Sequence, residues 1–380
     1  MDWLMRPLRG SLNGYAQFLG FSKLLLWPFI YMYGAFVKVP VMQNAPLLPP
    51  AKGLESWPLV IFSHGLCGGR TAYSQYCSTL AASGRVILAI EHGDGTAPLS
   101  AKWLLEGNKM KISSEQLYLK EQEIDWETPE EVSKFQLRQD QLLFRRHEVY
   151  MVHSAFSSFV NGTVNLESID GEKIPLDSWR TPDSSSSPSV NCTSNIALTG
   201  HSFGGATLLS LLSTHPPSEE YSALPISKMI CLDPWLEPLA SEDPTPVNNE
   251  STSPVSSLVI NSEGFTLWDS HFERLQRILR GWNTTELLTL VRSQHIHFSD
   301  FKVLPLVRTA EATALQTMIC NLSIAFLESQ TGDPPPSQRT PDIHTRGMQI
   351  VHTGKTADYG DGKRTSKRRL DGVLGDVVVH

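Results

Sequence analysis

Ser202 is the residue of this sequence whose surroundings point most clearly to chemistry. It lies in the run GHSFG, which follows an apolar, strand-like segment over 196–199 and precedes a helix-forming run. A serine at such a corner is typical of a nucleophile elbow, a turn so tight that only small residues fit beside it. The neighbouring small residues are Gly200, Gly204, Gly205 and Ala206. The pattern predicts that Ser202 attacks a carbonyl carbon and that the backbone N–H of Phe203 faces the resulting oxyanion.

A serine hydroxyl needs a general base, and the base needs an acid that orients it. In a fold with this elbow, the acid and then the histidine follow the serine along the chain. Asp233 ends one strand-like segment and Glu263 ends the next, so the pattern alone leaves both acids open. His295 and His297 follow the last expected strand and are the candidate bases. A metal at this H-x-H pair would need a third ligand that the sequence does not offer, so we expect neither metal nor cofactor.

A second oxyanion donor is expected in the run SHGLCGG, which follows the first strand-like segment. Gly65, Gly68 and Gly69 allow the backbone to approach a substrate closely, and Leu66 would offer its N–H. Each such donor contributes about 3 kcal/mol of transition-state stabilisation.

The elements that hold these residues indicate an α/β protein. The segment 57–65 is continuously apolar, which is typical of a strand buried on both faces. A helix-like stretch closed by Gly84 and a second apolar run over 85–95 follow it. Strand, helix and strand at this spacing predict a parallel sheet. Together with the elbow, they predict an α/β-hydrolase fold, a mostly parallel sheet with helices on both faces.

The rest of the chain divides around this fold. A polar stretch over about 97–131 is predicted to be an insertion over one end of the sheet. A long amphipathic helix is expected from Pro129. The end of the chain is poor in apolar residues and rich in proline, glycine and charge. We therefore expect an N-terminal segment over 1–50, a catalytic domain over 51–329 and a disordered tail over 330–380.

The N-terminal segment contains an apolar stretch over 18–37 that is about long enough to span a bilayer. Lys23 and Pro28 interrupt it. Three interpretations stay open: a segment that covers the domain or docks on a membrane surface through Leu24–Tyr33, a spanning anchor, and a signal sequence. We favour the first.

The overall composition excludes other classes of protein. The chain has 380 residues and a formal net charge of -7, without a basic region over its body that would favour nucleic acid. Its five cysteines form no CxxC pair, so reduced and mostly buried thiols are expected. Five Asn-x-Ser/Thr triplets favour the secretory pathway only weakly. The sequence leaves the compartment and the oligomeric state open.

At five places the sequence resembles the platelet-activating factor acetylhydrolase family of the plasma and intracellular single-chain type. The resemblance rests on PLVIFSHGL with the following Arg70 and Tyr73, and on LAIEHGDGTA, GHSFGGAT, CLDPWLEPL and HIHFSDF. These runs occur in order between about residues 58 and 301.

The resemblance implies a calcium-independent α/β-hydrolase that removes short or oxidised acyl chains from the sn-2 position of phospholipids. The family pattern places the orienting acid at Asp233 and the base at His295, which leaves Glu263 as the alternative acid. It also matches Leu66 and Phe203 to the oxyanion donors.

The chain departs from the family in one motif near the pocket. It reads EHGDG where the family usually shows EHRDR, so Gly93 and Gly95 replace two arginines. This departure leaves the headgroup preference open. Two rival functions also remain: a general short-chain carboxylesterase, and a non-catalytic membrane-associated protein on a hydrolase scaffold.

Overall fold

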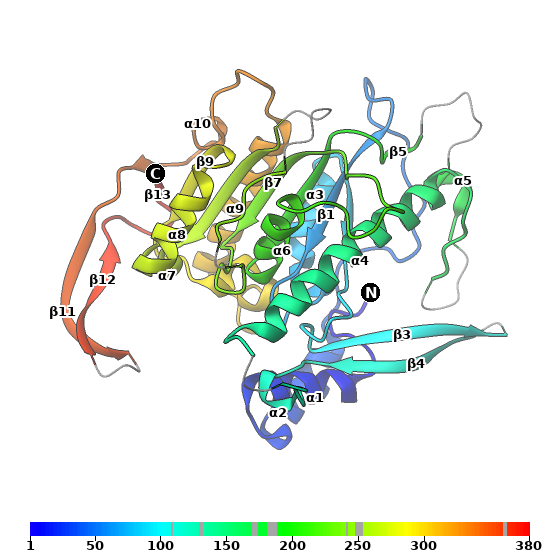
Figure 1. Ribbon diagram of the computed structural model, residues 1–380, viewed down its shortest axis with the longest axis horizontal. Coiled ribbons are helices and arrows are strands. Elements are labelled where there is room, and N and C mark those ends of the chain that lie inside the picture. Colours follow the sequence, from blue (N-terminus) through cyan, green and yellow to red (C-terminus); the bar gives the residue numbers. More distant parts are fainter. Residues whose placement is uncertain are drawn as a thin grey trace.

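The computed structural model describes residues 1–107, 109–128, 132–168, 174–180, 188–240, 242–247, 254–359 and 363–380. Within this part, a nine-stranded sheet forms the centre of the molecule (Figure 1). Its strands, in spatial order, are β10 (Thr345–Arg346), β13 (Val377–Val379), β9 (Asn283–Leu290), β8 (Ser256–Ser262), β7 (Ile226–Leu232), β6 (Ile196–His201), β1 (Trp57–Ser63) and β2 (Val86–Ala89), with β5 (Val190–Asn191) beside β1. The strands from β9 to β2 pair in parallel, and β13 pairs antiparallel with β9.

The central strands are buried on both faces, as their continuous apolar runs predict. In β6 every residue is buried. Only Ser227 and Lys228 of β7 and Ser256 of β8 are partly exposed. Helices cover both faces. On one side lie α4 (Gln136–Val160), α6 (Phe203–Leu212) and α8 (Asp269–Leu279), and on the other α3 (Ser74–Ala82) and α9 (Ala310–Glu328). The architecture confirms the prediction of an α/β-hydrolase fold.

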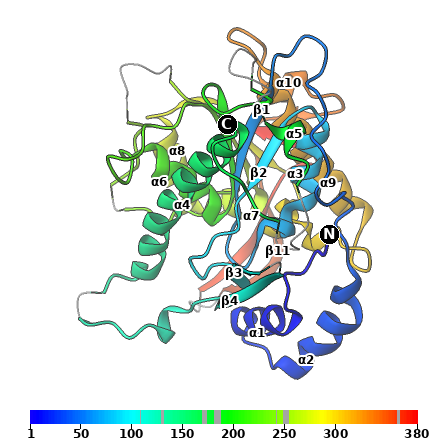
Figure 2. The ribbon, with the colours of Figure 1, turned by 90° about the vertical axis from the view of Figure 1, so that its right-hand side faces the viewer.

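The N-terminal segment packs on the α3 and α9 side of the sheet. It consists of α1 (Leu8–Leu19), α2 (Lys23–Pro28), a π-helical turn over Phe29–Tyr33 and a 3₁₀ turn over Gly34–Phe36. Trp3, Leu4 and Ile30 are buried in the same core as α9. In Figures 1 and 2, α1 and α2 lie at one end of the molecule beside an antiparallel hairpin of β3 (Leu99–Glu106) and β4 (Lys109–Leu117).

One described helix, α9, is long and apolar enough to cross a membrane by length and composition. Its residues Leu315, Ile319, Leu322 and Phe326 are buried against the sheet and α3, so it is a core helix of this fold. Residues 18–37, by contrast, form no single long helix: they contain the end of α1, the short α2 and the two turns that follow it.

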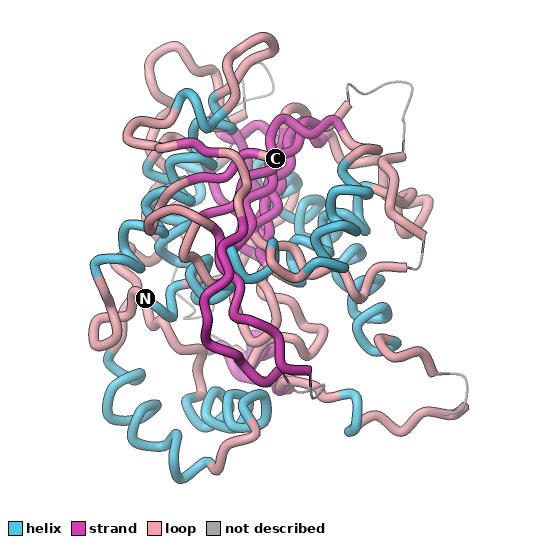
Figure 3. The backbone as a smooth tube through the Cα atoms, turned by 90° about the vertical axis from the view of Figure 1, so that its left-hand side faces the viewer, coloured by secondary structure: helices cyan, strands magenta, loops and turns pink. Residues whose placement is uncertain are grey.

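The expectation of a disordered tail over 330–380 is wrong for the described residues. The segment contains α10 (Pro336–Arg339), β10 and β13 of the central sheet, and a hairpin of β11 (Ile350–Tyr359) and β12 (Lys363–Leu370). The hairpin projects from the sheet edge (Figures 1 and 3). Val377 and Val378 are buried against β9. The strand β13 is formed by three consecutive valines, a residue type that favours strands. The polar composition of the segment as a whole led to the prediction of disorder.

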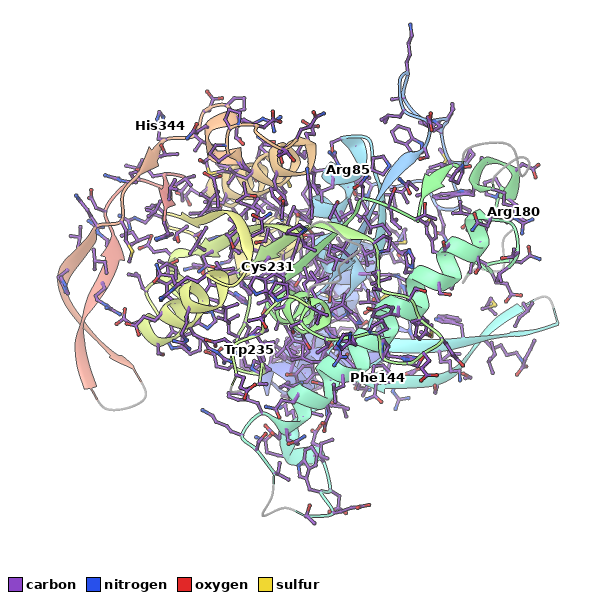
Figure 4. The ribbon with its side chains drawn as sticks, turned by 45° about the horizontal axis from the view of Figure 1, so that its top comes forward. Arg85, Phe144, Arg180, Cys231, Trp235 and His344 are labelled. Carbon is purple, nitrogen blue, oxygen red and sulfur yellow. The ribbon has the colours of Figure 1, made fainter. Side chains whose placement is uncertain are left out.

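Two other sequence predictions can be compared with the structure. The long helix starts at Gln136 rather than at Pro129, and residues 129–131 lie outside the described part. All five cysteines are unpaired and buried, as expected for reduced thiols. Cys231, labelled in Figure 4, lies among the packed side chains of the central strands.

Candidate active site

Ser202 lies at the corner between β6 and α6. Its backbone has φ 57° and ψ -118°, and residues other than glycine rarely adopt a positive φ. A Cβ on Gly204 would overlap the carbonyl oxygen of Ser63, so the close approach of α6 to β1 requires glycine there. The turn holds the serine hydroxyl at the carboxyl edge of the parallel sheet, where the chain ends of β1, β7 and β8 also lie.

Three side chains from separate elements form a hydrogen-bonded chain at this edge. The Ser202 hydroxyl lies 2.8 Å from Nε2 of His295, whose Nδ1 lies 2.7 Å from Oδ2 of Asp233. The other Asp233 oxygen accepts the backbone N–H of Ser262 at 2.7 Å, and Asp233 is fully buried. Both carboxylate oxygens of Asp233 therefore have a hydrogen-bond partner. The side chain of His295, by contrast, is 38% exposed and accessible to a substrate.

The alternative acid, Glu263, has different partners. Its carboxylate accepts the backbone N–H of Arg292 at 2.5 Å and the N–H of Leu370 at 3.0 Å, and it forms an ion pair with the Arg292 guanidinium. It therefore ties the C-terminal hairpin to the sheet. The alternative base, His297, accepts the N–H of Gln294 through its own Nδ1 at 2.8 Å. Hydrogen bonds thus join Asp233 and His295 to Ser202, whereas Glu263 and His297 bond to other residues.

Aromatic side chains fix the plane of the His295 ring. Phe265 stacks on it with centroids 4.5 Å apart and an interplanar angle of 14°, and His201 lies at 4.5 Å and 38°. Burial holds the pKa of His201 well below its ordinary value, so this neighbour is neutral. A neutral ring can lie beside an imidazolium without repelling it. Neither ring is among the predicted site residues: Phe265 lies in no motif, and His201 occupies a position of the GHSFG run that the elbow leaves open to any residue.

The loop after β1 approaches the serine closely. A Cβ on Gly65 would lie 2.9 Å from Cβ of Ser202, so a side chain there would clash with the serine. The N–H of Gly65 donates to the Tyr73 hydroxyl at 3.1 Å, and the N–H of Gly68 closes a turn onto the Gly65 carbonyl at 3.2 Å. Leu66 lies inside this turn, beside the elbow that carries Phe203.

The site also contains atoms that could coordinate a metal ion. Ligand atoms of His201, Asp233 and His295 lie within 4.8 Å of one another. The protein itself uses several of them, because both Asp233 oxygens accept hydrogen bonds and Nδ1 of His201 lies 2.8 Å from the Tyr73 hydroxyl. A hydrogen-bonded proton relay accounts for this arrangement without a metal.

Comparison with known proteins gives one family. The sequence model described as "Platelet-activating factor acetylhydrolase, isoform II" matches residues 2–332. The platelet-activating factor acetylhydrolase of Bos taurus is 28% identical over 341 residues, which are 87% of this chain and 69% of the bovine protein. The protein from Cavia porcellus is 28% identical over 340 residues, again 87% of this chain and 69% of its own.

Two further similarities are more limited. A "Putative phospholipase A2" of Schizosaccharomyces pombe is 45% identical over 62 residues, 16% of this chain and 14% of that protein. A solved structure, a ferulic acid esterase from Streptomyces cinnamoneus, aligns with a TM-score of 0.46 and 16% identity, covering 76% of this chain and 71% of its own.

Proposed function

The chain belongs to the family of platelet-activating factor acetylhydrolase, isoform II, and we propose on that premise that it cleaves short or oxidised acyl esters from the sn-2 position of phospholipids with Ser202, His295 and Asp233 as its catalytic triad. It is a serine hydrolase by its family. The observation that carries the proposal is the hydrogen-bonded chain from Ser202 through His295 to the buried Asp233.

In the first half of the reaction, Ser202 forms a bond with the ester carbonyl carbon. His295 accepts the hydroxyl proton at Nε2, which lies 2.8 Å from the serine oxygen. The imidazolium that forms is stabilised by Asp233, which is fixed in place by Ser262. The former carbonyl oxygen becomes an oxyanion, which accepts the N–H groups of Leu66 and Phe203.

In the second half, the ester bond breaks. His295 gives its proton from Nε2 to the departing sn-2 oxygen, and a lysophospholipid leaves. Water then attacks the acyl-enzyme while His295 again accepts the proton, and transfer of that proton to Ser202 releases the carboxylic acid. Every proton is returned, so the cycle needs only substrate and water.

We also propose that the N-terminal segment docks the enzyme on its aggregated substrate. Along α2 and the following turn, one set of apolar side chains points into the core and another is exposed. The exposed set is Phe21, Leu24, Leu25, Trp27, Phe29, Met32 and Phe36, and we refer to it as the N-terminal apolar patch. These side chains lie on α2, the π-helical turn, the 3₁₀ turn and the residue pair before α2. Large exposed apolar patches are typical of surfaces that meet a membrane or a partner.

The position of this patch suits an interfacial enzyme. The Tyr33 hydroxyl accepts the N–H of Leu306, itself 75% exposed, and Trp3 donates from its indole to Asp300. These contacts join the N-terminal segment to the stretch that follows His295. We infer that a lipid surface at the patch would also meet the side of the molecule that carries the exposed Leu306.

The substrate class is tested by three parallel assays. The full chain is given vesicles with 1-hexadecyl-2-acetyl-glycerophosphocholine, the same lipid with a 2-palmitoyl chain, and soluble p-nitrophenyl acetate, each with and without EDTA. We expect the acetyl lipid to be cleaved without calcium, and the palmitoyl lipid at least about a hundredfold more slowly, because a pocket for a short chain excludes a long one. Cleavage of p-nitrophenyl acetate without cleavage of either lipid would instead indicate a general short-chain carboxylesterase.

A further inference from the structure

Arg145 is a fully buried arginine in the middle of α4. A buried guanidinium is unfavourable unless each of its donors finds a partner. Its Nε donates to Asp94 at 2.7 Å, its Nη2 to the Thr96 hydroxyl at 2.5 Å, and its Nη1 to the backbone carbonyl of His64 at 2.6 Å. One rigid side chain thus joins α4 to two separate loops at the carboxyl edge of the sheet.

These contacts connect Arg145 with both oxyanion donors of the proposed mechanism. His64, whose carbonyl it holds, lies two residues before Leu66. The guanidinium carbon lies 4.7 Å from the centroid of the Phe203 ring. A third connection runs through Thr96, whose carbonyl accepts the N–H of Cys67 at 2.8 Å. The same cation therefore contacts the residues around both N–H groups.

We propose that Arg145 is a positioning residue that sets the separation and direction of the two oxyanion donors. The inference rests on the proposed serine-esterase function. An oxyanion donor works only when it lies about 2.7–3.1 Å from the position of the oxyanion, and a misplacement of about 1 Å can cost about a hundredfold in rate. Arginine suits the task because its planar group offers five donors in a fixed geometry, whereas lysine offers a single ammonium on a flexible stem.

A second anchor on the same helix supports this reading of α4. One turn further along, Glu148 lies 2.6 Å from Nδ1 of His92 and accepts the N–H of Gly93 at 2.8 Å. Nε2 of His92 lies 2.9 Å from the hydroxyl of Ser63, the last residue of β1. The helix thus holds the end of β1 through two independent polar connections, both immediately before the loop that contains Leu66.

The chain offers a matched control for the test. Arg138 is also buried on α4, two turns before Arg145, but its guanidinium contacts Tyr118, Gln141 and the carbonyl of Leu119 instead of the residues around the donors. Arg145→Lys and Arg138→Lys are compared with the wild type and with Ser202→Ala. For each, kcat and KM are measured with p-nitrophenyl acetate, together with the inhibition constant of an alkyl trifluoromethyl ketone and the thermal midpoint. The ketone's adduct with serine carries an oxyanion and so reports on the donors directly.

We expect Arg145→Lys to lower kcat by about a hundredfold and to change KM less than about threefold. The inhibition constant of the ketone should rise in proportion to the loss of kcat/KM. Arg138→Lys should change each of these less than about threefold. Equal losses of kcat in the two lysine variants, or a loss confined to KM, would overturn the proposal.

If Arg145→Lys does not fold, Thr96→Val decides the question, because it keeps the shape of the side chain and removes the hydrogen bond that the Thr96 hydroxyl accepts from Arg145, together with the one it donates to Asp94, the ion-pair partner of Arg145. We then expect a several-fold loss of kcat and of ketone affinity at constant KM, and unchanged values in a folded Thr96→Val would refute the role. The proposed function itself fails separately, if the wild type shows no Ser202-dependent cleavage of p-nitrophenyl acetate.

Discussion

Replacing Leu24, Leu25 and Met32 with serine should release the protein from lipid surfaces while leaving its fold and triad intact. These side chains belong to the N-terminal apolar patch and are 83%, 72% and 69% exposed. Because they make few contacts with the core, the substitutions should change the free energy of unfolding by only about 0.5 kcal/mol each.

The size of the effect on binding follows from that exposure. Fully burying a leucine or methionine side chain contributes about 2 kcal/mol, so moving these three from water into lipid contributes about 1.5 kcal/mol each. Complete insertion would then account for about a thousandfold in vesicle affinity, and insertion to half that depth for about thirtyfold. The triple variant should therefore bind phosphatidylcholine vesicles about 30 to 1000 times more weakly.

The assay combines co-sedimentation with vesicles, hydrolysis of the acetyl phospholipid in those vesicles, and hydrolysis of p-nitrophenyl acetate. A control triple variant changes Leu143, Phe144 and Met151 to serine. These residues are 58%, 51% and 47% exposed on α4, where Figure 4 labels Phe144. The patch variant should lose vesicle binding and vesicle activity and keep the soluble activity. A loss of binding below threefold, or an equal loss on both substrates with a lower thermal midpoint, would refute the docking argument.

Two further predictions follow from the site and its buried acids. Asp233→Asn should lower kcat about 10⁴-fold, because an amide at this position favours the wrong tautomer of His295. Glu263→Gln should change kcat less than about tenfold and lower the free energy of unfolding by about 1–3 kcal/mol. The reverse pattern would make Glu263 the orienting acid. Burial raises the pKa of Glu148 to about 7. Between about pH 4.5 and pH 7 the folded state therefore keeps a proton that the unfolded state has lost, so stability is lost as the pH rises across this interval and levels off above it. Glu148→Gln cannot ionise, and between pH 5 and pH 8 its stability in urea should therefore improve by about 2–3 kcal/mol relative to the wild type; a constant difference would contradict this linkage.

The elements around Ser202 could be predicted because their signals are local. A strand buried on both faces is a continuous apolar run, and an elbow needs small residues at fixed offsets from the serine. The contacts of Asp233 and Glu263 were not local in this sense. Both acids end a strand at the same edge of the sheet, and they differ through partners distant in sequence, His295 for the first and Arg292 for the second.

Other features were hidden for related reasons. In the sequence Arg145 looks like any charged residue of an amphipathic helix, and its burial depends on Asp94 and on loops that join only in the fold. The C-terminal strand has few apolar residues around it, and its place in the sheet depends on β9, which ends at Leu290. Composition averaged over a segment cannot reveal three valines that meet a partner strand.

The central claim is that Ser202 is the nucleophile of a serine esterase, and covalent labelling tests it most directly. The wild type and Ser202→Ala are treated with an alkyl fluorophosphonate, and the adduct is located by mass spectrometry of the digested protein. We expect a single adduct on the peptide that contains Ser202, a matching loss of activity toward the acetyl phospholipid, and in Ser202→Ala no adduct and less than about a thousandth of the wild-type activity. An adduct on another residue, or substantial activity in a folded Ser202→Ala variant, would contradict the account.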